Sequence, residues 1–439
     1  GVDGGVQKHV VEMAQLFGAA DPRPRLGVNY KLPVIFAGNK DVREQIKKIL
    51  GSKTALEIVD NIRPTLEEEN LQPARLKIQS QFLEHVMAHA PGYPKLMAMT
   101  DEQIMPTPAA VGMIMQRVAQ TRSINILGVD IGGATTDVFS VFDGHFNRTV
   151  SANYGMSYSI SNVVAEAGLN NVMRWVPFDV DEPQLRNRVK NKMIRPTSIP
   201  YLMEDLEIEQ AICREALRLS FEQHALLADG LKGVQHQAEI GSIFSQGEKR
   251  SLIDPMRLDM LIGSGGVLSH APERWQTAWM LLDSYLPCGI TQLAVDSIFM
   301  MPQLGVLSSI LPEAAAYVFE KDCLIELGTC VAPRFTNGKA AAPGQDLLKV
   351  ELEGEGSFIL HMGEIKVKKL PVGQSIKARL LPLGRTDVGQ GAGQAVECVL
   401  KGGTTGIIFD GRGREPFVLP QERSVLISKL QEWKAALKG

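Results

Sequence analysis

The sequence predicts an α/β protein that ends in a small all-β domain, and three observations support this fold class. Apolar runs of strand length alternate with segments of helical periodicity as far as about residue 338. Beyond Gly338, short alternating strands lie between glycine-rich turns, which is typical of a small barrel or sandwich. The length of 439 residues is more than one compact core holds and indicates two or three domains.

The first hundred residues alternate between helix and strand. A short apolar run predicts a buried strand at residues 32–37. Helical periodicity predicts helices at residues 6–17, 41–50, 54–61 and 72–89. Asp41 is the expected N-cap of the second of these helices, and Glu67, Glu68 and Glu69 are expected to form a solvated face. We interpret this part as a sheet whose first strands are missing.

The remaining elements follow the same reasoning. The pattern predicts helices at residues 106–120, 179–192, 201–227 and 271–282, a loop followed by a helix at 153–167, and a helical stretch near Ala316. Core strands are expected at residues 126–131, 138–142, 260–262 and 292–297. The all-β part is expected to have strands at residues 347–353, 357–360, 364–369, 375–381, 395–400 and 405–409, and a closing helix at 424–437.

Composition excludes several functional classes. Hydrophobic residues make up 44% of the chain and charged residues 22%, and the net charge is −3. The two signs of charge are mixed, so nothing favours nucleic acid or an anionic membrane surface. The longest apolar run, residues 299–319, is broken by Pro302, Gln303, Pro312 and Glu313 and is unsuited to span a bilayer. We therefore expect neither a nucleic-acid partner nor a membrane contact.

Cysteine usage indicates a reducing compartment. The five cysteines are few, odd in number and scattered, and no CxxC pair exists. We therefore expect free thiols, a cytoplasmic location and no zinc or iron–sulfur site. No signal peptide is visible, and the chain begins with Gly1 in a glycine-rich loop that has no strand before it. We expect that it starts inside a larger protein or a processed product.

A glycine pair between two apolar runs is the most informative local pattern. Residues 126–131 form the first run, Gly132 and Gly133 follow, and residues 138–142 form the second run, as in a strand, a tight turn and a returning strand. Two successive positions without side chains let backbone N–H groups approach an anion, and Thr135 and Thr136 add hydroxyl donors. Two acids flank this turn, Asp130 and Asp137.

Acids beside a phosphate repel it unless a cation lies between them. The pattern therefore predicts a nucleotide bound with Mg²⁺. The alternative is a hairpin whose glycines serve geometry alone. A second glycine-rich turn, residues 263–266, follows a predicted strand and precedes a helical stretch; it is either a simple strand-to-helix turn or a ligand loop. Its place downstream of the first turn favours the ligand loop, because a nucleotide needs one loop for its phosphates and another for its adenosine.

Three motifs together resemble the actin-like ATPase superfamily, which includes sugar kinases, heat-shock chaperones and actin. VDIGGATTDV at residues 129–138 resembles the second phosphate motif of that superfamily, and LIGSGGVLS at 261–269 is similar to its adenosine motif. PTPAAVGMI at 106–114 resembles the helix that joins the lobes. This resemblance implies an actin-like (ribonuclease H-like) ATPase core that binds ATP and Mg²⁺.

Within that superfamily the chain resembles the glutamate mutase L accessory proteins. The segments that carry the likeness are VDGG at residues 2–5, PVIFAGNK at 33–40, the hairpin, IGSGG at 262–266 and AVDSIFMMPQLGVL at 294–307. The likeness covers most of residues 1–319 and implies a role beside an adenosylcobalamin-dependent mutase, as a chaperone that exchanges damaged cofactor. Together with the change of pattern after Gly338, we expect a domain division into residues 1–104 (the rest of a first lobe), 105–338 (a second lobe), 339–420 (the β domain) and 421–439 (the closing helix).

The resemblance assigns roles to single residues. Asp130 would hold the Mg²⁺ shell or position the attacking water. Donors to phosphate would be Gly132, Gly133, Thr135 and Thr136. The adenosine side would be lined by Gly263, Ser264, Gly265 and Gly266. Asp137 would either support Asp130 or serve the fold alone.

One departure from the superfamily leaves the activity open. The superfamily begins with a strand–turn–strand that carries an Asp and a Gly-Ser or Gly-Thr pair, and this sequence has no match to it. Either a first segment is missing, or phosphate binding is incomplete. Two alternatives to an ATP-binding accessory protein therefore stand, which are a metabolite kinase of the same fold and a degenerate module that does not hydrolyse ATP.

Other candidate residues favour ordinary structural roles. His85 and His89 have a spacing that can bind zinc, but no Glu lies beside His85 to act as a base. Cys288 has no neighbour that would lower its pKa. Arg412 and Arg414 lie on an expected turn, where solvated side chains are the favoured interpretation and a partner contact is the alternative.

Overall fold

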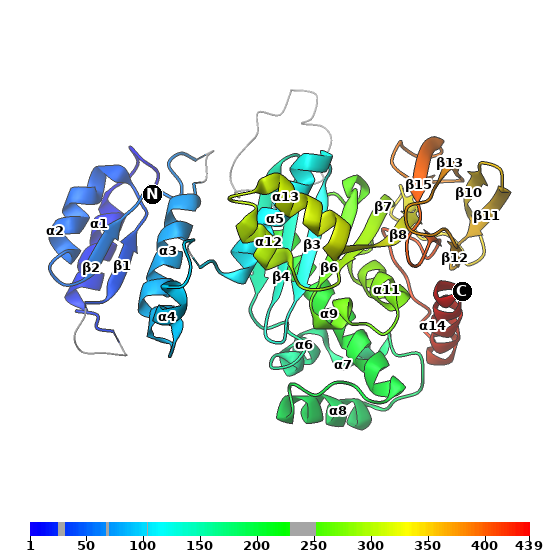
Figure 1. The fold of residues 1–439 in the computed structure, drawn as a ribbon, viewed down its shortest axis with the longest axis horizontal. Helices are drawn as coiled ribbons and strands as arrows, with labels where there is room; N and C mark the ends of the chain where they lie inside the picture. Colours follow the sequence, from blue (N-terminus) through cyan, green and yellow to red (C-terminus); the bar gives the residue numbers. More distant parts are fainter. Residues whose placement is uncertain (25–30, 67–69, 103, 229–251) are drawn as a thin grey trace. The chain divides into compact units, whose positions relative to one another are not determined.

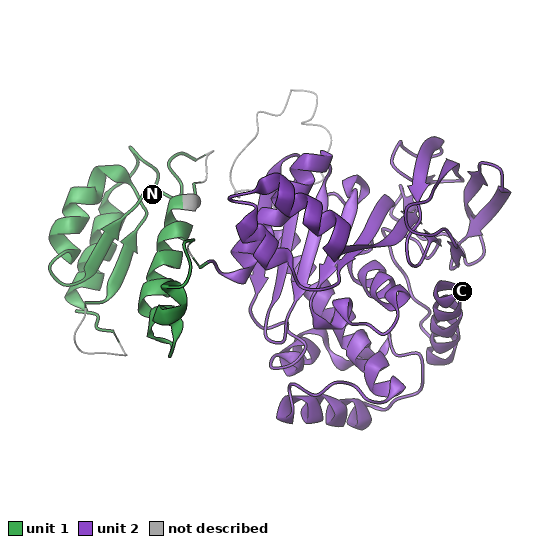
Figure 2. Cartoon of the chain, in the orientation of Figure 1, with its two compact units in different colours: residues 1–104, 230–248 green, residues 105–229, 249–439 purple. Residues whose placement is uncertain are grey.

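The computed structural model describes residues 1–24, 31–66, 70–102, 104–228 and 252–439 (Figure 1). It divides into two compact units (Figure 2). The N-terminal unit comprises the described residues up to Ile104, and the C-terminal unit comprises the described residues from Met105 to Gly439. Within the described ranges, no helix has the length and apolar character needed to cross a membrane.

The N-terminal unit is a small α/β layer. Its elements are α1 (Lys8–Ala19), β1 (Pro33–Phe36), α2 (Arg43–Leu50), β2 (Ala55–Ile58), α3 (Gln72–His85) and α4 (Tyr93–Met97). β1 and β2 are parallel, and α2 is the helix that connects them. The core between α1 and α2 contains Ala14, Val42, Ile46 and Leu50.

Two predictions for this unit are wrong. Residues 54–61 contain strand β2 instead of a helix, because pairing with β1 decides the state of a short apolar segment that periodicity leaves ambiguous. Asp41 is not an N-cap. The side chain of Asn39 caps a short 3₁₀ turn before α2 by accepting the N–H of Asp41, while the Asp41 carboxylate accepts the N–H of Gly4 at 2.8 Å. The run from Glu67 to Glu69 lies outside the described residues.

The C-terminal unit is built on a mixed sheet, which has eight strands among the described residues. The strand order is β12-β16-β8-β7-β6-β3-β4-β5. The bounds are β3 Ile126–Ile131, β4 Thr136–Phe142, β5 His145–Ser151, β6 Met260–Ser264, β7 Gly289–Asp296, β8 Leu324–Ala332, β12 Ile365–Lys368 and β16 Ile407–Asp410. β3, β6 and β7 are parallel, whereas β4 is antiparallel to both of its neighbours. The carboxyl ends of β3, β6 and β7 therefore meet at one edge of the sheet.

Helices cover both faces of this sheet (Figure 1). One face packs against α5 (Thr107–Arg122), α12 (Met301–Leu307) and α13 (Pro312–Val318). The other packs against α6 (Ile160–Ala167), α9 (Met203–Ala228), α11 (Arg274–Tyr285) and α14 (Arg423–Lys438), with α7 (Leu169–Met173), α8 (Glu182–Ile194) and α10 (Gly266–Ser269) nearby. Side chains of β3 alternate between the two cores, with Ile126 on the α5 side and Leu127, Val129 and Ile131 on the α9 side.

The strands after Gly338 are divided between a sheet of their own and the large sheet. Four of them, β10 (Asp346–Leu352), β11 (Gly356–His361), β13 (Ser375–Pro382) and β15 (Val396–Lys401), make an antiparallel sheet in the order β11-β10-β13-β15. The short strands β9 (Arg334–Phe335) and β14 (Thr386–Asp387) pair with each other. β12 and β16, however, extend the large sheet, since β16 lies parallel to β8. The division into compact units accordingly has no boundary near Gly338. The periodicity of the sequence identifies the strands, but it does not show which strands pair with one another.

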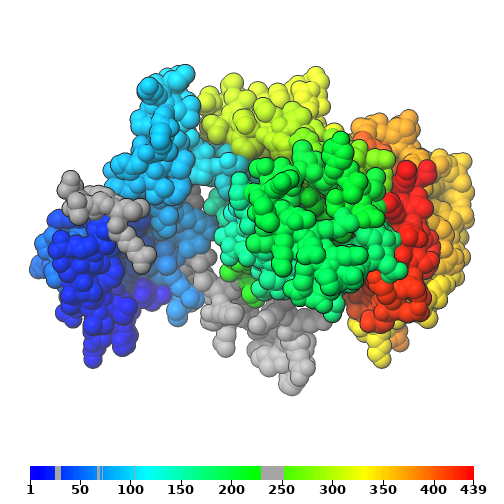
Figure 3. Space-filling view, turned by 90° about the horizontal axis from the view of Figure 1, so that it is seen from below, coloured from blue at the N-terminus to red at the C-terminus, as the bar shows by residue number. Residues whose placement is uncertain are grey.

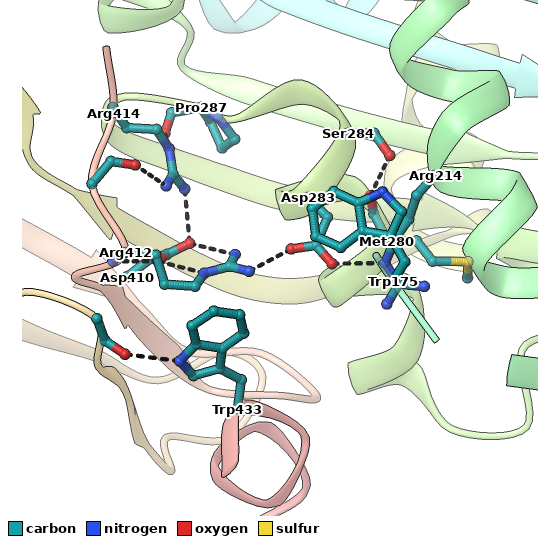
Figure 4. Close-up of polar contacts among 12 residues, drawn as sticks. Trp175, Arg214, Met280, Asp283, Ser284, Pro287, Asp410, Arg412, Arg414 and Trp433 are labelled. Carbon is teal, nitrogen blue, oxygen red and sulfur yellow. Dashed lines mark hydrogen bonds and ion pairs between the residues drawn. The ribbon is translucent and has the colours of Figure 1, made fainter. Parts of the chain in front are cut away.

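Arg412 and Arg414 are not solvated, which corrects the interpretation of their turn. Both are 1% exposed and belong to a buried ionic cluster with Asp283, Asp410 and Arg214 (Figure 4). Asp410 accepts Arg412 Nε at 2.9 Å and Arg414 Nη2 at 2.8 Å. Asp283 accepts Arg412 Nη1 at 2.5 Å and Arg214 Nε at 2.7 Å. The cluster therefore joins the segment after β16 to α11 and α9.

Every acid of this ionic cluster has a cationic partner. Burial alone would raise the pKa of Asp410, but the charges of Arg412 and Arg414 outweigh burial and hold the pKa well below its usual range. The guanidinium of Arg412 also lies 5.1 Å from the ring centroid of Trp433 on α14. Arg414 Nε donates to the carbonyl of Pro287 at 3.0 Å (Figure 4). The sequence interpretation failed because it judged each arginine by its local turn and not by its distant partners.

Candidate functional site

The predicted hairpin is present, and its turn presents backbone N–H groups. β3 and β4 pair with Asp130 opposite Asp137. The carbonyl of Gly132 accepts the N–H of Met156, and the carbonyl of Gly133 accepts those of Ser157 and Tyr158, all at 2.9 Å. These bonds hold the turn against the loop after β5. Within the described residues, the N–H groups of Gly133 and Ala134 have no acceptor, so they are available to an anion.

Not every predicted donor in this turn is available. The N–H of Gly132 donates to the carbonyl of Thr135 at 2.8 Å. The Thr136 hydroxyl is fully buried and donates to the carbonyl of Tyr154 at 2.6 Å. The Thr135 hydroxyl bonds to Asp137. The structure therefore places the anion-binding capacity in backbone N–H groups, and it leaves the two threonine hydroxyls with structural partners.

Three carboxylates gather at the carboxyl ends of β3 and β7 and at the start of β4. Burial raises the pKa of Asp130, the negative charge of Asp296 raises it further, and a hydrogen bond from Ser264 opposes the shift. Asp296 is fully buried at the end of β7, and burial raises its pKa, although it accepts the N–H groups of Ile298 and Met301 at 3.2 Å. The sequence analysis did not single out Asp296, although an acid after an apolar strand is the same signal that identified Asp130.

Asp137 is the most strongly perturbed of these acids. Burial and the nearby charge of Asp130 raise its pKa to about 7, while Arg148 and the Thr135 hydroxyl oppose the shift. Its Oδ1 atom is buried without a hydrogen-bond partner. Such an orphaned oxygen beside a second carboxylate is the donor set that a hard cation requires. The described residues contain no group of three side chains arranged to hold a metal ion, whereas Mg²⁺ commonly uses one or two carboxylates together with phosphate oxygens and water.

The second glycine turn lies directly beside the first. Gly265 has φ +102°, and a Cβ atom there would come within 2.1 Å of the carbonyl oxygen of Ile131, so only glycine allows this close approach. Ser264 is buried and bonds to Asp130, and Gly263 lies within β6 against Leu268. Of these four predicted adenosine residues, Gly266 alone lines the cavity described next.

A cavity of about 370 Å³ brings the two turns together. One wall contains Gly132 and Gly133, and another contains the segment from Gly266 to Pro272. Another wall comes from the end of α8, the start of α9 and the segment between them, which belong to the green part of Figure 3. Its residues are Lys192, Ser198, Ile199, Pro200, Leu206 and Glu209. Sequence reasoning missed this wall because no motif or regular spacing links the end of α8 to α9.

The remaining reactive side chains are unsuited to catalysis. Burial raises the pKa of Cys288 to about 12, which makes its thiol a poor nucleophile. His224 is buried between the hydroxyls of Ser140 and Thr149, and burial lowers its pKa to about 4. His85 and His89 belong to no group of three metal-binding side chains among the described residues.

Comparisons with known proteins agree with the sequence resemblance. The family model described as MutL protein matches residues 1–323. Protein MutL of Clostridium tetanomorphum is 24% identical over 347 residues, which cover 73% of this chain and 71% of that protein. Among solved structures, component A of (R)-2-hydroxyglutaryl-CoA dehydratase from Acidaminococcus fermentans is 15% identical and covers 58% of this chain and 87% of its own. Its TM-score of 0.26 is too low to transfer fold or function.

Proposed function

Since the chain belongs to the MutL (glutamate mutase L) protein family, we propose that it is an ATP-binding accessory protein of an adenosylcobalamin-dependent mutase. The observation that carries ATP binding is the 370 Å³ cavity, which is lined by both glycine turns. Its volume suits a small-molecule site. One of these turns has free backbone N–H groups for phosphate, and the other faces it across the same cavity.

The fold of the C-terminal unit supports the actin-like part of this proposal. The strands β5-β4-β3-β6-β7 are adjacent in that order, and β4 alone is antiparallel to the others. This is the strand order of a ribonuclease H-like sheet, the unit from which actin-like ATPases are built. The two glycine turns follow β3 and β6 at the carboxyl edge of the parallel strands, where α/β sheets commonly bind ligands.

Residue roles follow from the geometry. The N–H groups of Gly133 and Ala134 bind phosphate oxygens, and Asp130 holds Mg²⁺, with Asp137 beside it. Asp130 and Asp137 would hold a Mg²⁺ ion between themselves and the phosphates, and such an ion would offset the repulsion between these acids and the phosphates. Ser264 orients the Asp130 carboxylate through its hydrogen bond. Gly265 allows the second turn to approach β3 closely enough to complete the cavity.

The accessory role requires that nucleotide binding changes affinity for the mutase. A ligand shifts a conformational equilibrium only through different contacts in the two states. The wall formed by α8 and α9 provides such contacts, because Lys192, Ser198 and Glu209 line the cavity while the neighbouring Ile199 and Tyr201 are 84% and 98% exposed. A nucleotide that draws this wall inward would rearrange an exposed apolar surface available to a partner protein.

Calorimetry with Mg-ATP tests the proposal. We expect the wild-type chain to bind Mg-ATP and the Asp130→Asn variant to bind it at least about tenfold more weakly, because a carboxylate ligand of the cation is lost. Asp143→Asn is the matched control, since Asp143 is an exposed acid at the other end of the same hairpin. If titration of the wild type with Mg-ATP gave no heat, that result would contradict ATP binding and favour the degenerate module. ATP turnover that appears only when the mutase is added supports the accessory role.

One observation favours a second candidate, the metabolite kinase. A larger cavity of about 550 Å³ shares Lys192, Ser198, Ile199, Pro200 and Glu209 with the first cavity. A kinase needs an acceptor site of this kind beside its nucleotide. Transfer of the γ-phosphate of ATP to a small metabolite, without any mutase present, would favour this function over the accessory role.

A further inference from the structure

An ion pair in the wall of the 370 Å³ cavity has no assigned role. Lys192 lies in the last turn of α8, and Glu209 lies near the start of α9. Lys192 Nζ is 3.0 Å from Glu209 Oε1, and the two side chains are 11% and 17% exposed. They are the only Lys, Arg, Asp or Glu residues among the described residues that line this cavity.

Electrostatics and position place this pair at the nucleoside end of the cavity. A carboxylate next to a triphosphate repels it unless a cation lies between them; because Glu209 already pairs with Lys192, we place it away from the phosphates. Lys192 and Glu209 also line the neighbouring 550 Å³ cavity, whereas Gly132 and Gly133 line only the smaller one. The glycine turn and the ion pair therefore lie at different ends. The pair is accompanied by Ile199, Pro200 and Leu206, apolar side chains that suit a flat ring better than a phosphate.

Each partner of the pair has unused hydrogen-bonding capacity. An ammonium group carries three N–H donors. Two of those of Lys192 Nζ have partners, which are Glu209 Oε1 and the carbonyl of Ser198. Glu209 Oε2 accepts from no donor in the described part of the chain. Burial raises the pKa of Glu209, and Lys192 opposes that shift. One N–H donor of Lys192 and the Oε2 acceptor of Glu209 thus lie side by side without partners among the described residues. The site is partly desolvated, so leaving these groups without hydrogen bonds costs free energy.

Adenine presents the complementary pair of groups on one edge, because the donor N6 amino group adjoins the acceptor N1. We propose that Lys192 and Glu209 read the base of the bound nucleotide, with Glu209 accepting from the 6-amino group and Lys192 donating to N1. This inference rests on the proposed ATP binding. It assigns base specificity to the wall from α8 and α9, and phosphate binding to the turn after β3.

Removing the 6-amino group from the ligand tests this assignment directly. The probes are ATP and purine riboside 5′-triphosphate, which lacks that group, both titrated with Mg²⁺ in a calorimeter. We expect the wild type to prefer ATP by about tenfold or more, the value of one hydrogen bond to a charged acceptor. Glu209→Met lacks the acceptor, so we expect the ratio of its affinities for ATP and for purine riboside 5′-triphosphate to fall to about one. Glu222→Met is the matched control, because Glu222 is an exposed acid on the same helix, and it keeps the wild-type preference.

The remaining outcomes separate this inference from the proposed function. No binding of ATP by the wild type overturns both. Binding of ATP with a preference that Glu209→Met leaves unchanged overturns base reading alone. A Glu209→Met variant that instead loses its discrimination against 2′,3′-dideoxy-ATP also overturns it, because Glu209 would then contact the ribose. If Lys192 without its partner prevents folding, the double variant Lys192→Met with Glu209→Met leaves no unpaired charge and gives the same comparison.

Discussion

The C-terminal unit buries two groups of charged side chains, and they are built in opposite ways. The ionic cluster joins Asp283 and Asp410 to three arginines. The strand-end acids, Asp130, Asp137 and Asp296, instead have like charges near them, since Asp130 interacts with both Asp137 and Asp296. The pKa of Asp410 lies well below its usual range because of its arginines, whereas burial and like charge raise the pKa of Asp137 to about 7. Similar burial therefore produces opposite shifts, and the partners decide the direction.

This difference distinguishes a group whose charges are paired within the chain from a group whose like charges a bound cation would offset. The ionic cluster has its charges paired within the chain and holds the C-terminal segment against α9 and α11. The strand-end acids lower the stability of the fold when they ionise, and a bound cation would offset that cost. The pH dependences have opposite signs. Stability from Asp410 is present above the unfolded pKa and is lost as the pH falls, while the cost of Asp137 appears as the pH rises from about 4 to about 7.

The largest expected effect comes from breaking the ionic cluster. Asp283→Asn removes the charge that Arg214 and Arg412 share. We expect a loss of about 3–5 kcal/mol in the free energy of unfolding, because the buried Arg214 loses its counter-charge and Arg412 keeps only Asp410. Glu222→Gln on α9 is the control, since its exposed pair with Arg218 contributes about 1 kcal/mol or less. Denaturant melts of both variants check the prediction; equal midpoints would show that the buried pairs do not hold this region together.

The second expected effect concerns the titration of Asp137. With a folded pKa of about 7 and an ordinary value of 3.8, ionisation of Asp137 costs the fold up to about 4 kcal/mol above neutral pH. Asp137→Asn cannot ionise. We therefore expect the variant to melt higher than the wild type at pH 8 and to melt near it at pH 4. Thermal melts across this range measure the difference. A constant difference between the two proteins at all pH values would mean that Asp137 does not titrate as proposed.

The wild type and Asp137→Asn also test whether Mg²⁺ binds beside Asp137. If Mg²⁺ binds beside Asp137, it stabilises the wild type at pH 8 by mass action and stabilises Asp137→Asn less. The stabilisation weakens toward pH 5, because the protonated carboxyl no longer attracts the cation. NaCl at the same ionic strength controls for screening of surface charge.

The sequence pointed to Asp130 and Asp137 but to no member of the ionic cluster as a buried group, and the reason is physical. Asp130 and the glycines lie within one hairpin, so their spacing along the chain already describes their spacing in space. Asp283 and Arg412 are 129 positions apart in sequence, and nothing local distinguishes a buried arginine from a solvated one. The same limit applies to Lys192 and Glu209, which come from different helices. It also explains why β16 was predicted as a strand but not as a neighbour of β8.

The smallest expected effect tests the hydroxyl of Thr135, which supports Asp137. Thr135 bonds to Asp137 and opposes the rise of its pKa. Thr135→Val should therefore move the Asp137 titration to higher pH, with a stability change of about 1 kcal/mol. Thr136→Val is the matched control, because the Thr136 hydroxyl bonds to the carbonyl of Tyr154 and not to an acid. Carboxyl ¹³C shifts of labelled aspartates, assigned with Asp137→Asn, follow the titration. If Thr136→Val moved the titration and Thr135→Val did not, the hydrogen bond to Asp137 would be assigned to the wrong threonine, and the anion-binding turn would need a different arrangement of donors.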